Sequence, residues 1–213
     1  MKINGENTAI ETLSSLNHHL NGTSIADTEK LQAIQFHFAK IMEALGLDLD
    51  DPSLSKTPER VAKMYVNDIF KGLNKNNFPK TSFFENSCDY KDMILIDNIT
   101  LYSYCEHHFV PFFGKVAVAY IPNGRVIGLS KINRIVQFIA SQPQIQERLT
   151  VEIGQKFKEL LNTENVAVFV EAHHLCVASR GIKDDSSMTK TSFFGGKFLK
   201  KKFQSRFLKT IHH

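Results

Sequence analysis

Apolar residues with helical spacing mark the first part of the chain. After Asp27 or Thr28, either of which can cap a helix, apolar residues recur three and four positions apart until Gly46. These residues are Leu31, Ile34, Phe38, Ile41 and Leu45. A second helix is predicted with Thr57 as its cap and Pro58 in its first turn, where the missing N–H is not needed. Its predicted buried side consists of Val61, Met64, Tyr65 and Ile69.

The spacing changes to the alternation of β-strands in the second part of the chain. Four segments are predicted to be strands, namely residues 93–104, 115–121, 166–177 and 189–194. The turn signal at residues 122–124 lets residues 125–129 continue the second strand as a hairpin. Residues 74–91 have the polar composition of a loop.

Two further helices are predicted between the two pairs of strands. Ser130 caps the first of them, and Pro143 starts the second. Their apolar faces are Ile132, Ile135, Val136 and Ile139 in the first, and Ile145, Leu149, Ile153, Phe157 and Leu160 in the second. This order of elements predicts an α+β fold, in which N-terminal helices precede an antiparallel four-stranded sheet with two helices packed on one side.

The same pattern divides the chain into segments. Residues 1–26 form a polar N-terminal segment, and residues 27–213 form one domain. Within this domain, residues 27–75 are expected to be helical and residues 90–213 to contain the sheet.

Composition and charge narrow the class of protein. The hydrophobic fraction of 42% is enough for a core, and the three cysteines are too far apart to indicate a disulfide framework. The apolar runs are too short to cross a bilayer, and the N-terminus lacks a signal-peptide core, so we expect a cytoplasmic protein without membrane contact. The basic tail at residues 197–213 is expected to be a solvated helix, because no nucleic-acid-binding motif accompanies it.

Candidate chemistry is concentrated in two short clusters, Cys-Glu-His-His at 105–108 and His-His-Leu-Cys at 173–176. Strand alternation places His174 and Cys176 on one face and His173 on the other. In the first cluster the chain has to turn if its cysteine and its last histidine are to bind the same ion.

The set of Cys105, His108 and Cys176 would leave a fourth position for water, as in catalytic zinc sites. Two buried thiols and an ordinary histidine are the alternative, and the spacing by itself leaves both open.

Several other side chains near these clusters could transfer protons or bind anions. His107 and His174 would lie near a metal without binding it, and histidines titrate close to neutral pH. Glu147, at a helix start, could favour the helix dipole or hold a polar ligand edge. Phosphate-binding candidates are Arg60, Lys63, Lys131, Arg134 and Arg180. Ser130 with Lys131 is the best of them, because helix N-termini attract anions.

The chain resembles the GTP cyclohydrolase I family. The resemblance rests on SKTPERVAKMY, YCEHHFVPFFGKVAVAYIPNGRVIGLSKINRIV, QPQIQERLT and EAHHLCVASRG, which occur in the family's order. It implies zinc-dependent hydrolysis of GTP to 7,8-dihydroneopterin triphosphate and formate, the first step of folate and pterin biosynthesis. It also implies a tunnelling fold that assembles into a toroidal decamer, with active sites at the subunit interfaces.

The resemblance also implies a role for each site residue. Zinc would be bound by Cys105, His108 and Cys176, and protons would be handled by His107 and His174, with Ser130 as a relay. Glu147 and Gln146 would hold the guanine of GTP. Triphosphate contacts would come from Ser130, Lys131, Arg134 and Arg180, and from Arg60 and Lys63 of another subunit.

Two other functions are compatible with these residues. One is a tunnelling-fold enzyme that acts on a different purine or pterin. The other is a non-catalytic oligomer that zinc stabilises and that binds nucleotides. A structural zinc site normally has a fourth protein ligand, so solvent access to the metal would separate the second from an enzyme.

Overall fold

The computed structural model describes residues 25–211. It divides into two compact units, residues 1–76 and 77–213. Most of the predicted N-terminal segment, residues 1–26, lies outside the described residues. Within the described part, no helix is both long and apolar enough to cross a membrane.

The first unit is helical, as predicted. It contains α2 (Asp27–Ala44), α3 (Thr57–Lys63), the π-helical η1 (Met64–Ile69) and the short η2 (Lys71–Leu73). The predicted caps are wrong, because the N-cap positions belong to Ala26 and Lys56 and neither makes a side-chain capping bond. Pro58 does lie in the first turn of α3.

The buried side of this unit differs from the predicted one. Its buried apolar residues are Met42, Pro58, Ala62 and Phe70. Ile41, Leu45 and Met64, which we expected on the buried faces, are exposed. Two helices that pack on each other can cover only one strip of each, so part of each apolar face is left uncovered.

The second unit is built on the sheet that the alternation predicts. Its strands are β2 (Ile94–Cys105), β3 (Pro111–Tyr120), β6 (Val166–His174) and β7 (Thr189–Phe194), each antiparallel to the next. A two-residue strand, β5 (Pro143–Gln144), adds a parallel edge next to the end of β2. Pro143 therefore starts this strand and not a helix.

A second, two-stranded sheet corrects the predicted hairpin. Residues 125–127 form β4 (Arg125–Ile127), which pairs with β1 (Phe83–Glu85) and not with β3. The predicted loop at residues 74–91 thus contains a strand. β1 is only three residues long, and it is a strand because β4 supplies its hydrogen bonds, which no local pattern indicates.

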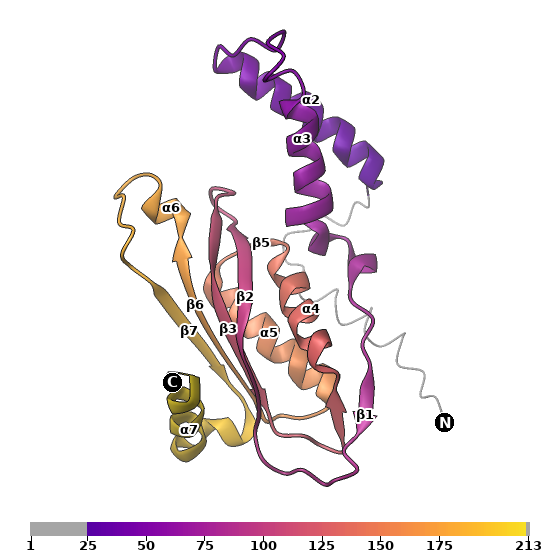
Figure 1. Cartoon of the computed structure of the whole chain (residues 1–213), viewed down its shortest axis with the longest axis vertical. Helices are drawn as coiled ribbons and strands as arrows, with labels where there is room; N and C mark the ends of the chain where they lie inside the picture. The colour runs from indigo at the N-terminus through magenta and orange to yellow at the C-terminus, as the bar shows by residue number, and fades with distance from the viewer. Residues whose placement is uncertain (1–24, 212–213) are drawn as a thin grey trace. The chain divides into compact units, whose positions relative to one another are not determined.

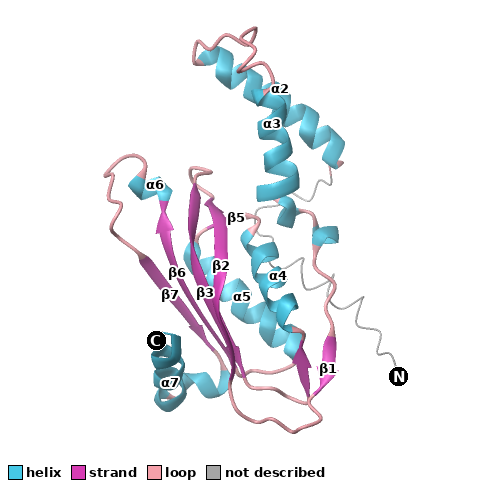
Figure 2. Cartoon of the chain, viewed as in Figure 1, coloured by secondary structure: helices cyan, strands magenta, loops and turns pink. Residues whose placement is uncertain are grey.

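Helices α4 (Leu129–Ala140) and α5 (Gln146–Leu161) cover one face of the main sheet, as expected (Figure 1). Helix α4 contacts β2, and α5 contacts β6 and β7. The valines of β3 and β6 at positions 116, 118, 168 and 170 are fully buried. Figure 2 shows that α7 (Lys201–Ile211), preceded by η4 (Gly196–Leu199), lies on the other face at one end. There Phe198 and Phe207 pack against small residues of β3 and β6, among them Ala117 and Ala167.

Candidate metal centre

The chain turns directly after β2, as two ligands to one ion would require. Cys105 is the last residue of β2, and residues 106–108 form a turn. Two backbone bonds close this turn, from Phe109 N to Cys105 O at 2.8 Å and from Cys105 N to Val110 O at 2.9 Å. Phe109 takes a positive φ of 52°. The turn brings His108 back beside Cys105, with 3.9 Å between its Nδ1 and the cysteine Sγ.

The other ligand candidate is not on a strand, contrary to the prediction. β6 ends at His174, and Cys176 lies in the one-turn helix α6 (Leu175–Ala178). The last pair between β3 and β6 is Phe112 with His174, and beyond it the chain leaves the sheet and forms a helical turn. This helical turn, and not strand alternation, carries the Cys176 sulfur towards the first cluster.

Cys105, His108 and Cys176 form a group that could hold a metal ion. One ligand atom from each lies within 4.8 Å of the others. A tetrahedral ion with bonds of about 2.0–2.3 Å holds its ligand atoms about 3.5–3.8 Å apart, so small side-chain movements would close the group. Two sulfurs and an imidazole nitrogen are suitable donors for zinc. Cys105 is buried and His108 is exposed, so the group opens to solvent on one side.

Neighbouring residues shift the pKa of Cys176 and contact the ring of His108. Burial raises the pKa of the Cys176 thiol, and the neighbouring Cys105 raises it further, while Arg180 opposes the shift. The Arg180 guanidinium also donates to His108 Nε2 at 3.0 Å. A guanidinium only donates, so Nδ1 carries the proton of a neutral His108 in this contact. Coordination through Nδ1 requires the opposite tautomer, and the Arg180 contact would then have to open.

His174 is held next to this group by Gln146. The Gln146 amide nitrogen donates to Val170 O, Thr189 O and Thr191 Oγ1 at 3.0–3.2 Å, which leaves Oε1 as the acceptor for His174 Nε2 at 2.8 Å. His174 therefore carries its proton on Nε2, and Nδ1 keeps the lone pair.

Two further interactions act on the His174 ring. It stacks on Phe112 with ring centroids 4.6 Å apart. Burial lowers the pKa of His174, and the Glu147 charge partly offsets this shift. The ring is thus held in one orientation, and its neutral form is favoured.

The comparisons with known proteins agree with this geometry. A family model described as GTP cyclohydrolase I matches residues 34–212. The chain belongs to the GTP cyclohydrolase I family.

Two curated relatives show how far this similarity extends. GTP cyclohydrolase 1 of Haemophilus ducreyi is 55% identical over 180 residues, which cover 84% of this chain and 83% of that protein. GTP cyclohydrolase 1 of Flavobacterium johnsoniae is 52% identical over 187 residues, which cover 88% and 84%. Among solved structures, the chain is similar to the apo archaeosine synthase QueF-Like, with a TM-score of 0.37 and 20% identity over 49% of this chain and 93% of that one.

The structure brings some of the residues predicted for a GTP cyclohydrolase I site together. Glu147 lies exposed in the first turn of α5, close enough for its charge to act on His174. His107 is also exposed, with its Nδ1 3.8 Å from Cys105 Sγ. Gln146 is 2% exposed, so the role in guanine binding expected for it stays a prediction beside its contact with His174.

The predicted phosphate-binding residues are spread over the structure: Arg180 contacts His108 of the metal group, and the others belong to α4 and α3. Ser130, Lys131 and Arg134 lie in the N-terminal half of α4, whose N-cap is Gly128, not Ser130. The other end of this helix contacts the ligand-bearing strand, since Ser103 Oγ donates to Ala140 O at 2.7 Å. A helix of 12 residues is roughly 18 Å long. Arg60 and Lys63 belong to α3 in the first unit, where Lys63 pairs with Glu59.

A group of polar side chains without a predicted role lies beside the ligand-bearing turn. Gln144, Arg148 and Glu152 form polar contacts around Glu106, the one residue of the first cluster without a predicted role. The only signal in the sequence was the i, i+4 spacing of Arg148 and Glu152, which is common on solvated helix surfaces.

Proposed function

We propose that this chain is a GTP cyclohydrolase I, which hydrolyses GTP to 7,8-dihydroneopterin triphosphate and formate in the cytoplasm. The observation that carries the proposal is the group of Cys105, His108 and Cys176, with the oriented ring of His174 beside it, in a chain that belongs to this family. The product would supply folate or pterin biosynthesis.

The metal held by these three residues is proposed to be zinc. Two thiolates and one imidazole make a donor set with three protein ligands, which is typical of catalytic and not of structural zinc. The solvent-exposed side at His108 leaves room for a substrate. When bound, the metal would supply Lewis-acid activation of water for attack on the imidazole ring of guanine.

Proton transfer is assigned to the two histidines that do not bind the metal. Gln146 Oε1 accepts a hydrogen bond from the Nε2–H of His174, so the Nδ1 atom is the one that takes or gives a proton during ring opening. Burial lowers the pKa of His174 and so favours the neutral ring, in which Nδ1 can take a proton and later return it. His107, exposed and close to Cys105, is the second proton-transfer group.

Substrate binding is assigned to residues that grip the two ends of GTP. The exposed Glu147 carboxylate, with Gln146 beside it, would accept hydrogen bonds from guanine. The triphosphate would contact Ser130, Lys131, Arg134, Arg180, Arg60 and Lys63. Ser130 would also relay protons during the later rearrangement of the ribose carbons. Anchoring both ends places the reacting carbon over the metal, and such positioning accounts for much of an enzyme's rate.

The distance along α4 between the predicted triphosphate-binding residues and the metal-bearing strand supports an oligomer with shared active sites. Ser130 and Lys131 lie at the opposite end of this helix from the strand that carries Cys105. A neighbouring copy of the chain would have to present its own Ser130 and Lys131 for one site to hold both metal and triphosphate. A toroidal decamer of tunnelling-fold subunits is the assembly that we propose.

Incubation of the purified, zinc-loaded protein with GTP tests the function. We expect formate and a pterin triphosphate that fluoresces after oxidation, in equal amounts, and we expect a chelator to abolish both. If the metal-loaded oligomer leaves GTP unchanged, the proposal is wrong. Release of another base product from another purine would instead indicate a different substrate for the same fold.

A further inference from the structure

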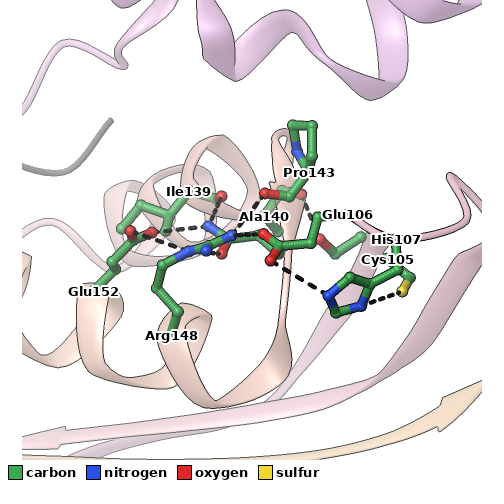
Figure 3. Close-up of polar contacts among 10 residues, drawn as sticks. Cys105, Glu106, His107, Ile139, Ala140, Pro143, Arg148 and Glu152 are labelled. Carbon is green, nitrogen blue, oxygen red and sulfur yellow. Dashed lines mark hydrogen bonds and ion pairs between the residues drawn. The ribbon is translucent and has the colours of Figure 1, made fainter. Parts of the chain in front are cut away.

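Glu106 lies in the ligand-bearing turn, and its carboxylate is paired with Arg148 of α5 (Figure 3). Each side chain keeps only 20% of its surface exposed. The same guanidinium donates from Nη2 to Pro143 O at 3.0 Å and from Nε to Gln144 Oε1 at 3.1 Å. The Glu106 backbone N–H also donates to Gln144 O, at 3.1 Å. The turn is therefore fastened to β5 and α5 through both its backbone and its side chain.

These contacts continue into the buried surface of α5. The Gln144 side chain is almost fully buried and donates to Glu152 Oε2 at 2.8 Å and to Ile139 O at 3.2 Å. The other Glu152 oxygen lies 3.7 Å from Arg148 Nε. Arg148 thus stands between two carboxylates, that of the ligand-bearing turn and that of a rigid helix (Figure 3).

A contribution to stability does not by itself explain why the charged side chains of Glu106, Arg148 and Glu152 are clustered here. Removing ionised groups from water costs free energy, and well-packed apolar residues often serve stability equally well. A guanidinium fork, unlike an apolar contact, fixes direction as well as distance. The parts of the turn whose direction matters are the two ligand candidates on either side of Glu106, Cys105 and His108.

We propose that Glu106 and Arg148 form a positioning pair for the metal site. The pair holds the turn so that Cys105 and His108 stay within ligand distance of Cys176, and it thereby raises the affinity for the metal. Glu106 Oε1 also lies 3.8 Å from His107 Nε2, so the pair orients that ring as well. Groups that orient metal ligands without binding the ion contribute about 10–100-fold to metal affinity. This inference rests on the proposed metal site.

Metal affinity of conservative variants tests the pair. In Glu106→Gln the side chain keeps its size and one acceptor but loses its charge, and in Arg148→Lys it keeps the charge but loses the fork. We expect each variant to weaken Zn²⁺ and Co²⁺ binding about 10–100-fold in chelator competition. The thiolate-to-cobalt absorption bands of the Co²⁺-loaded variants should shift, because the ligand geometry relaxes. The double variant should resemble either single variant, since both remove the same interaction.

Asp92→Asn is the matched control, because it breaks another carboxylate–guanidinium pair, with Arg206 of α7, at the opposite end of β2. Its metal affinity and cobalt spectrum should equal those of the wild type. Unchanged affinity and spectrum in Glu106→Gln and Arg148→Lys, with only a lower melting temperature of the metal-free protein, would overturn the inference and leave the proposed function standing. A wild-type protein that binds no metal at Cys176 would overturn the proposed function, and this inference with it.

Discussion

At one end of the main sheet, β2 and β6 end in cysteines, histidines and a charged network, whereas at the other end the same sheet is covered by phenylalanines of η4 and α7. Phe198 and Phe207 are fully buried there, with ring centroids 6.1 Å apart. At the polar end, by contrast, His108 is exposed and Cys176 is half-buried. The apolar end can be stabilised by burial alone, which is non-directional. The polar end contains directed hydrogen bonds, which the proposed metal ligands and proton donors would need because they work only in one orientation.

Substitution of a proposed metal ligand should show the largest effect on activity. Cys176→Ala removes one of the three donors, so we expect loss of stoichiometric zinc and a fall in GTP turnover of at least about 10³-fold, equivalent to several kcal/mol of transition-state stabilisation. Metal analysis and a formate assay measure both. Cys88→Ala is the control, because Cys88 is exposed and outside the group, and it should keep both zinc and turnover. A full equivalent of zinc in Cys176→Ala would refute the ligand assignment.

A substitution at the apolar end of the sheet should lower the stability of the protein and leave its metal binding unchanged. Phe207→Ala leaves a cavity against Phe198 and the alanines of β3 and β6, so we expect the free energy of unfolding to fall by about 3–5 kcal/mol. Urea denaturation measures this loss. The protein that remains folded should bind zinc as the wild type does. Loss of zinc from folded Phe207→Ala would show that the two ends of the sheet are coupled.

Gln146 separates positioning from substrate binding at the polar end. Gln146→Leu removes the acceptor for His174 Nε2, so we expect kcat to fall about 10²-fold while zinc is retained. Gln146→Glu keeps an acceptor for that proton and should retain more activity. The two predicted roles of Gln146, orienting His174 and binding guanine, would change different steady-state constants. A rise in KM with unchanged kcat would favour the guanine contact over the contact with His174.

The smallest effect is expected from the exposed ion pair between Asp92 and Arg206. The hydrogen bond from Arg206 lowers the pKa of Asp92 below its usual 3.8. A depressed carboxyl pKa adds stability above the unfolded pKa, and this stability is lost as the pH falls through the folded value. Asp92→Asn should therefore melt slightly below the wild type at pH 7, and the difference should vanish in melting curves recorded well below pH 3.8. A large difference at low pH would mean that another group is responsible.

Elements with a clear local period were predicted well. The strand at 189–194 has the predicted ends, and all four residues of the predicted apolar face of α4 are buried. Errors occur where a segment's structure depends on a distant partner. Residues 125–127 were predicted to pair in a hairpin but pair with β1 instead. Cys176 was predicted to lie in a strand, but the pairing of β6 with β3 ends at His174.

The sequence alone determined the types of residue at the candidate site and the family to which they point. Cys105, His108 and Cys176 could be named together because metal donors are rare side chains and their clusters stand out. Only the tertiary structure decided how these residues meet and what supports them. The pairing of Glu106 with Arg148, and of His174 with Gln146, joins positions 42 and 28 residues apart. Such contacts depend on the packing of a sheet against a helix, which no local periodicity encodes.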